Sequence, residues 1–398
     1  MPSTLGPSGY VVTDTTSGST TSSGTNASTV QKNVPASGAG APTSSRYART
    51  RAAIAKVKAK TGNMRIGLLG DSTQAGAYAL GAGTIWTGCR AVSHTPFFAA
   101  ALNSKDAPAI SSSFFGDQNL SGGITTPQYD PRIAYGAGWG VSTAKSVGAN
   151  MQYNNTTTNA LTFLPNEEVD TFEIYYAIAP GAAQFTVSRT GDTTSGVIDS
   201  AGTNALGKYV FTGALGGANP ISIQRNGVGA GLFIIGVNAY NSAQSAIQCY
   251  NWGWNSGAVS NWVDAATPFS PLAAMLAIPC DHYLFTYGIN QWASAVSLAA
   301  STADLTTAVD AMLAVGDVSL CTGYPSQKSV ATLAVQKTYI DALYTVAAAR
   351  GLAVNDMWQK VGSYEAAFPM GFYANSAHPV SALYKLKAEA DANMILSL

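Results

Sequence analysis

The stretch Met64-Arg65-Ile66-Gly67-Leu68-Leu69-Gly70-Asp71-Ser72-Thr73 is a short apolar run that ends in a glycine and three polar residues. An apolar run of this length before a turn signal is typical of a buried parallel strand. In an open parallel sheet, ligands bind beyond the carboxyl ends of the strands. We therefore expect a strand over residues 64–69 that places Ser72 at a candidate ligand-binding edge.

The C-terminal part of the chain repeats this alternation of apolar strands and helical segments. The predicted strands cover residues 246–250, 283–287, 318–321 and 352–356, and the predicted helices cover residues 303–314, 331–349 and 381–396. Strands that alternate with helices imply right-handed crossovers and a parallel sheet covered on both faces. The sequence therefore predicts an α/β fold, a three-layer α/β/α flavodoxin-like architecture.

The middle of the chain has a different pattern. Short β-rich segments occur without helical periodicity between them, at residues 171–178, 184–188, 208–211, 221–224 and 232–237. Turns containing Gly, Asn and Pro separate these segments, as in antiparallel sandwiches. We expect residues 151–245 to form an antiparallel β-sandwich inserted into an α/β domain of residues 46–150 and 246–398.

Residues 1–45 are rich in Ser, Thr, Gly, Ala and Pro, and Asp14 and Lys32 are their only charges. Such a composition cannot bury enough apolar surface to form a core, so we expect a flexible arm. The alternative is an arm that attaches the protein to a larger assembly. The first residues also lack the basic start and apolar run of a signal peptide. Together with the composition of the arm, this leads us to expect an extracellular or virion-associated location.

The composition argues against several classes of partner. Of 398 residues, 46% are hydrophobic and 11% are charged, with 21 basic and 21 acidic residues. The sequence contains no basic stripe, so we expect no nucleic-acid partner. We also expect no membrane span. The cysteines are widely spaced and form no CxxC pair, so we expect buried free thiols, no metal site and no cofactor. They are Cys89, Cys249, Cys280 and Cys321.

Four residues that suit nucleophilic catalysis follow predicted strands. A serine hydroxyl needs a base within hydrogen-bond reach and donors aimed at the developing oxyanion. Ser72 follows the first strand, Gly257 and Asn290 follow later strands, and His378 lies in a loop after the last strand. We therefore expect these side chains and backbone groups to meet at one edge of the sheet.

These residues resemble the sequence blocks of the SGNH (GDSL-like) hydrolases. The blocks read Gly70-Asp71-Ser72, Gly257, Gly288-Ile289-Asn290 and Asn375-Ser376-Ala377-His378, in the family's chain order. The resemblance covers residues 46–150 and 246–398 and implies an esterase that forms an acyl-enzyme on Ser72. It implies His378 as the general base. It also implies an oxyanion hole built from the backbone N–H groups of Ser72 and Gly257 and the Asn290 side chain.

Two positions depart from the family pattern. Gln291 stands where the third block usually has Asp, and Asn375 stands where the last block usually has Asp. In a chymotrypsin-like triad, replacing the aspartate with asparagine costs about 10⁴-fold in turnover. Three interpretations remain open. His378 and Ser72 form a dyad, with the ring oriented by Asn375 or a backbone carbonyl; another acid, Asp356 or Glu365, substitutes; or the protein is a weak or inactive relative.

The second block is also ambiguous, because Gly253 and Gly140 are alternatives to Gly257.

Members of the family that remove O-acetyl groups from glycans carry a similar inserted β domain, which resembles a carbohydrate-binding module. Four tryptophans are expected near the site, either facing a sugar or packed in the core: Trp139, Trp252, Trp254 and Trp292. His94 and His282 are expected to have structural roles.

We therefore predict hydrolysis of acyl esters, with an acetylated polysaccharide as the favoured substrate. One alternative is a lipase or thioesterase, which would act on longer acyl chains. The other is a glycan-binding or structural virion protein that retains the hydrolase fold without turnover.

Overall fold

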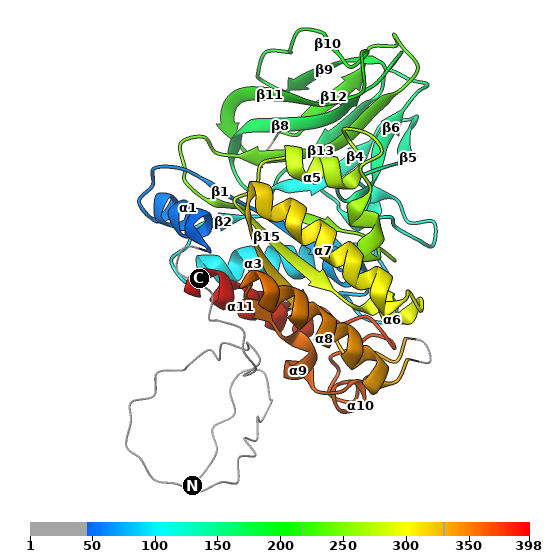
Figure 1. Ribbon diagram of the computed structural model, residues 1–398. Helices are drawn as coiled ribbons and strands as arrows, with labels where there is room; N and C mark the ends of the chain where they lie inside the picture. Colours follow the sequence, from blue (N-terminus) through cyan, green and yellow to red (C-terminus); the bar gives the residue numbers. More distant parts are fainter. Residues whose placement is uncertain (1–45, 218, 329–330) are drawn as a thin grey trace, which may run out of the picture. The chain divides into compact units, whose positions relative to one another are not determined.

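The computed structural model describes residues 46–217, 219–328 and 331–398 (Figure 1). The predicted arm of residues 1–45 lies outside these residues.

A parallel six-stranded sheet forms the centre of the α/β part, with the strand order β17-β16-β15-β1-β14-β2. Its strands are β1 (Met64–Gly70), β2 (Ala109–Ile110), β14 (Ile247–Gly253), β15 (His282–Tyr287), β16 (Asp317–Thr322) and β17 (Val354–Asn355). The predicted fold class is confirmed. The last strand is shorter than predicted, because Asp356 already caps the helix that follows it.

The helices pack in two groups. Helices α3 (His94–Asn103) and α11 (Ser381–Ser397) lie side by side, and α7 (Leu298–Val315) packs against both α5 (Pro271–Ala277) and α8 (Leu333–Arg350) (Figure 1). The remaining helices are α1 (Ala48–Lys58), α2 (Ser72–Ala75), η1 (Cys89–Val92), α4 (Thr126–Tyr129), η2 (Val259–Val263), α6 (Ile289–Ala293), α9 (Met357–Val361) and α10 (Tyr364–Ala367).

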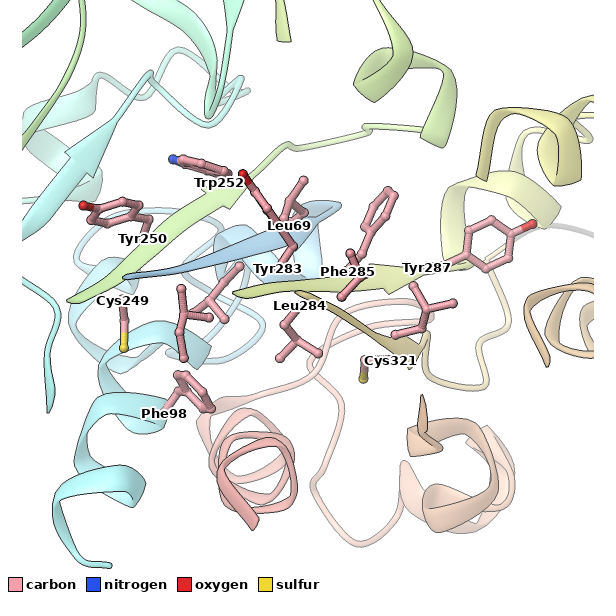
Figure 2. Close-up of a cluster of buried hydrophobic side chains, with 14 of the residues drawn as sticks. Leu69, Phe98, Cys249, Tyr250, Trp252, Tyr283, Leu284, Phe285, Tyr287 and Cys321 are labelled. Carbon is pink, nitrogen blue, oxygen red and sulfur yellow. The ribbon is translucent and has the colours of Figure 1, made fainter. Parts of the chain in front are cut away.

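Both faces of the parallel sheet are buried. Figure 2 shows Tyr250 and Trp252 on one face of the sheet, while Cys249 and Leu284 point to the other face, toward Phe98 of α3. Successive residues of a strand point to opposite faces, so a sheet covered on both sides reads as a nearly continuous apolar run. This explains why the runs at residues 64–69 and 283–287 were recognisable in the sequence.

Two antiparallel sheets make up the β region. One has the order β10-β9-β12-β7-β4 and the other the order β11-β8-β13-β6-β5, with β3 (Ser113–Phe115) also paired to β13. The other strands are β4 (Ile133–Tyr135), β5 (Trp139–Ser146), β6 (Ala149–Asn154), β7 (Ala160–Phe163), β8 (Val169–Ile178), β9 (Gln184–Arg189), β10 (Ile198–Asp199), β11 (Ala205–Gly216), β12 (Ile221–Arg225) and β13 (Leu232–Tyr240). The antiparallel strands thus begin before residue 151, where the insertion was expected to start.

A buried polar cluster joins the β region to the parallel sheet. The Arg65 guanidinium of β1 donates to Glu173 of β8 at 2.8 Å, and Lys208 of β11 pairs with the same carboxylate at 3.1 Å. Asn238 of β13 donates to Gln248 of β14 at 2.8 Å. Because a buried carboxylate is costly unless it is paired, these contacts favour one placement of the β region on the sheet.

Among the described residues, helix α7 is long and apolar enough to cross a membrane by length and composition. The expectation of no such segment was therefore wrong in that narrow sense, because a high alanine content raises the mean hydropathy of α7. Its Leu305, Val309 and Met312 are buried in the protein core, and its Asp310 pairs with Arg350. Helix α7 thus packs on the core with one face, and 28% of its residues are buried.

Candidate active site

Ser72 lies at the carboxyl end of β1, in the first turn of α2. The Asp71 carboxylate caps α2 by accepting hydrogen bonds from the Thr73 backbone N–H at 2.8 Å and the Thr73 hydroxyl at 2.7 Å. Ser72 is the first residue of the helix, a position whose N–H has no partner within the helix. The turn therefore presents the Ser72 hydroxyl and a backbone donor at the same edge of the sheet.

Gly253 allows α2 to approach the end of the neighbouring strand β14. It is paired with Gly70 in the sheet register. A Cβ atom at Gly253 would lie 2.3 Å from the backbone nitrogen of Ala75, closer than real Cβ contacts occur. Gly253 thus has a packing role, which is distinct from donating a hydrogen bond to an oxyanion.

His378 reaches Ser72 from the other end of the sequence. The distance from Ser72 Oγ to His378 Nε2 is 2.9 Å. A bridge between Tyr373 and Pro379 closes the loop that carries the histidine, and the Tyr78 ring stacks on the imidazole with centroids 4.8 Å apart. The loop and the stacked ring together hold the imidazole against the hydroxyl.

Asn375 determines which imidazole nitrogen carries the proton. Its Oδ1 accepts hydrogen bonds from the backbone N–H groups of Ala377 and His378, both at 2.9 Å, and lies 3.1 Å from His378 Nδ1. Because two backbone donors face this atom, it must be the amide oxygen, which only accepts. Nδ1 therefore carries the proton, and Nε2 is left with a lone pair toward Ser72.

The imidazole is held in its neutral form. Burial lowers the pKa of His378 to about 4, with a further contribution from the positive charge of Lys328. Among the described residues, no carboxylate opposes this shift. The two acids considered as substitutes are engaged elsewhere: Asp356 accepts from the Gln359 N–H as the cap of α9, and Glu365 accepts from Gln327. Neither makes a contact with His378 in the described part of the chain.

Asn290 lies at the same edge, in α6 at the end of β15. Gly288, which begins the helix, has φ +144°, and a Cβ there would lie 2.4 Å from the Trp292 ring. Asn290 Nδ2 donates to the Gly257 carbonyl at 2.9 Å, and Asn290 Oδ1 accepts from Lys328 Nζ at 2.9 Å. The Asn290 amide thus has one N–H engaged with Gly257 and a second N–H left for another acceptor.

The structure differs from the expectation for Gly257. Its backbone N–H donates to the Trp254 carbonyl at 2.8 Å within a turn. The N–H of Gly253 donates to the Asn251 side chain at 3.0 Å, and Gly140 lies in β5, outside the parallel sheet. The predicted Gly257 donor is therefore engaged, because its N–H closes the turn over residues 254–257.

The tryptophans expected near the site do not offer faces to a sugar. Trp139, Trp252, Trp254 and Trp292 are all buried, and the most exposed of the four has 8% of its surface accessible. Trp139 belongs to β5 of the antiparallel sheet, and Trp292 donates from its ring nitrogen to Ser326. These residues are core aromatics, which was the alternative interpretation.

The remaining histidines and cysteines lie in the interior. His282 contacts the hydroxyls of Thr50 and Ser319, and His94 bonds to Asp391 at 2.8 Å in a buried cluster with Lys387. His94 also accepts from Gln74 of α2, so this cluster supports the helix that carries Ser72. The four cysteines are free and buried, as expected, and the described residues contain no cluster of metal-ligating side chains.

Two residues beside the histidine were not predicted from the sequence: Lys328 and Tyr78. Lys328 follows β16 after a loop, so the rule that strand ends carry functional residues could have identified it. Tyr78 carries no comparable signal in the sequence. It has a left-handed backbone conformation (φ +60°), and its ring stacks on His378.

No protein-family model and no curated protein sequence matches the chain. A solved structure described as a peptidoglycan O-acetylesterase in action aligns with a TM-score of 0.63 and 16% identity, over 88% of this chain and 97% of that chain. A lipase/acylhydrolase from Enterococcus faecalis aligns with a TM-score of 0.32 and 16% identity, over 39% and 77% of the two chains. A family two carbohydrate esterase from Clostridium thermocellum, solved with cellohexaose, aligns with a TM-score of 0.30 and 10% identity, over 67% and 98%.

The first of these similarities shows a shared fold, and the other two are too distant to support an argument. Together with the parallel sheet and the blocks at its carboxyl edge, it establishes an SGNH hydrolase fold with additional antiparallel sheets.

Proposed function

We propose that the protein is a serine esterase in which Ser72 is the nucleophile and His378 is the general base. The observation that carries the proposal is the 2.9 Å contact between Ser72 Oγ and His378 Nε2, with the opposite ring nitrogen at 3.1 Å from an oxygen that can only accept. A neutral imidazole with its lone pair toward a hydroxyl is the arrangement that general-base activation of a nucleophile requires. Asn375 completes this arrangement without a carboxylate.

The reaction proceeds through an acyl-enzyme. As the Ser72 oxygen attacks the ester carbonyl, its proton passes to His378 Nε2, and the carbonyl oxygen becomes an oxyanion. The Ser72 backbone N–H and the second N–H of Asn290 are the donors for that oxyanion. The C–O bond to the alcohol then breaks, and the alcohol oxygen takes the proton from His378. Water activated by the same imidazole releases the acid and regenerates Ser72.

The favoured substrate is an O-acetyl ester on a polysaccharide. The similarity to the structure described as a peptidoglycan O-acetylesterase extends over 88% of this chain, a larger share than the α/β residues alone make up. It therefore includes part of the β region, which a simple lipase fold does not need. An extracellular or virion-associated protein would meet such an ester on the glycans of a bacterial surface.

A comparison of wild type with Ser72→Ala tests the proposal. We expect wild type to hydrolyse p-nitrophenyl acetate and to release acetate from an acetylated polysaccharide. We expect Ser72→Ala to lose about 10³-fold or more of the rate, since removing a nucleophile leaves only binding and oxyanion stabilisation. Ser104→Ala is the control, because Ser104 is exposed at the end of α3 and lies outside the four sequence blocks.

The outcomes separate the alternatives. Equal rates for wild type and Ser72→Ala would overturn the mechanism. Faster hydrolysis of long-chain than of acetyl esters would favour a lipase or thioesterase. Folded wild type without activity on any ester, but with affinity for a glycan, would favour the binding protein.

A further inference from the structure

Lys328 places a positive charge at the edge of the sheet that carries the candidate site. Its ammonium donates to Asn290 Oδ1 at 2.9 Å, and its side chain is half-buried. Its positive charge acts on both His378 and the buried Asp71 carboxylate. No part of the reaction described above uses Lys328, and none of the sequence blocks contains it.

The ammonium fixes the orientation of the Asn290 amide. An ammonium group has three donors and no acceptor, so the atom of Asn290 that faces it must be the oxygen. The nitrogen then faces the other way, where it donates to the Gly257 carbonyl at 2.9 Å. If the amide were flipped, two donors would meet at Lys328 and two oxygens would meet at Gly257. Lys328 therefore helps to keep the N–H groups of Asn290 on the side where an oxyanion would form.

The charge of Lys328 also affects the charge state of the His378 imidazole. In a Ser-His-Asp triad the carboxylate stabilises the imidazolium that forms during the reaction. Here the corresponding residue is the neutral Asn375, and the charged group nearby is a cation. A cation at this place disfavours the imidazolium, because like charges repel each other more strongly where burial lowers the effective dielectric constant.

We propose that Lys328 is a positioning residue for the oxyanion hole, which orients the Asn290 amide. This proposal rests on the proposed esterase function. It assigns to Lys328 a role in turnover that acts through Asn290.

Four variants of the full chain test the proposal: Lys328→Met, Lys328→Arg, Asn290→Ala and the double variant of Lys328→Met with Asn290→Ala. We expect Lys328→Met to lower kcat by about 10- to 100-fold with little change in KM, since removing an oxyanion donor costs about 10²–10³-fold. Lys328→Arg should retain part of the rate. The double variant should lose no more than Asn290→Ala, because Lys328 acts through that amide. Lys337→Met is the matched control, since Lys337 is exposed and pairs with Asp341 on the surface of α8.

The pH profile distinguishes this role from a merely structural one. The groups that face His378 are the Tyr78 ring, Asn375, Ser72 and the Lys328 charge. With Lys328 replaced by Met, the imidazolium is less disfavoured, so the acid limb of kcat/KM should move to higher pH. NMR titration of His378 should show the same shift in its pKa. A purely structural role leaves both unchanged in the fraction that remains folded.

The failures of the two proposals are distinguishable. Ser72-dependent activity in wild type, together with unchanged kcat in Lys328→Met, would overturn the role of Lys328 alone. Rate losses that multiply in the double variant would also overturn it. Wild type without any Ser72-dependent activity would overturn the esterase and, with it, this inference.

Discussion

At the residue scale, Asn375 supplies orientation without charge. Its Oδ1 receives two backbone N–H groups and lies 3.1 Å from His378 Nδ1, so the useful tautomer is fixed by the fold of the loop. An aspartate would accept the same hydrogen bonds and would also stabilise the imidazolium. As the proposed base, His378 is therefore oriented toward Ser72 but only weakly basic, with a pKa lowered to about 4.

This arrangement predicts activity at acid pH. The base works only when it is neutral, so kcat/KM should rise with pH through about 4 and stay level toward neutrality. In Asn375→Asp the new carboxylate raises the pKa of His378, so the acid limb should move to higher pH. Turnover at neutral pH should stay unchanged or increase. The measurement is the pH dependence of acetyl-ester hydrolysis.

A matched control for this prediction is Ser376→Asp, which adds a carboxylate at the adjacent, exposed position. Its effect on the acid limb should be small, because solvent screens an exposed charge. His378→Ala should abolish activity in either background. Full activity in His378→Ala, or an acid limb that Asn375→Asp leaves in place, would refute the dyad.

The contact between Ser72 and His378 could be predicted from the sequence, but the other partners of the candidate site residues could not. Ser72, Asn290 and His378 each follow a strand end, and parallel strands bring such positions to one edge. The hydrogen bond of the Gly257 N–H depends on a turn over residues 254–257, which spacing alone does not determine. Likewise, the ring of Tyr78 reaches His378 through three-dimensional packing, for which a local sequence pattern gives no signal.

At the element scale, the approach of α2 to β14 positions Ser72, the proposed nucleophile. Gly253 in β14 leaves room for the backbone of Ala75, three residues beyond Ser72. The buried cluster of His94, Asp391 and Lys387 supports the same helix through Gln74. The position of Ser72 thus depends on contacts beyond the four sequence blocks.

We predict that Gly253→Ala displaces α2. The added methyl group would overlap the Ala75 nitrogen at 2.3 Å, so either the helix or the strand must move. Displacing a nucleophile by about 1 Å can cost about 10²-fold in rate, and overpacking costs about 1–3 kcal/mol of stability. Kinetics with an acetyl ester and thermal denaturation measure the two effects.

Gly140→Ala is the control for Gly253→Ala. A Cβ at Gly140 would meet no atom within 4 Å, and its φ is not in the left-handed region. Its rate and melting temperature should therefore match those of wild type. Wild-type kinetics in Gly253→Ala would show that the close approach has no part in positioning Ser72.

At the scale of the whole molecule, the alternation of strands and helices was sufficient to predict the parallel sheet. The β region was recognised less completely, because strands such as β5 (Trp139–Ser146) carry mostly small and polar residues and alternate between half-buried and exposed positions. The attachment of the β region through Arg65 and Glu173 joins residues far apart in the sequence. Neither feature produces a periodic apolar pattern, which is the signal on which sequence interpretation depends.

The three histidines of the chain link its stability to pH. Burial lowers the pKa of His94 and His378 to about 4 and that of His282 to about 3. Asp391 partly opposes the shifts of His94 and His282, while Lys387 adds to that of His94. An unfolded histidine titrates near pH 6.5. Between these values, the unfolded chain binds protons that the folded chain does not, so the histidines stabilise the fold above about pH 6.5 and lose this effect as pH falls toward 4.

We therefore predict that the melting temperature falls steadily from pH 7 to pH 5. Each histidine contributes a slope of up to about 1.4 kcal/mol per pH unit. Burial raises the pKa of Asp71, Asp117 and Asp281, so their protonation favours the folded chain. At the acid end of the range they therefore oppose the destabilising effect of the histidines. His282→Asn, whose amide can still bond to the hydroxyls that His282 contacts, removes one titrating group and should reduce the slope by about a third, even if it lowers stability at every pH. A slope of stability against pH that is the same in wild type and His282→Asn would show that this buried histidine is not a source of the acid sensitivity.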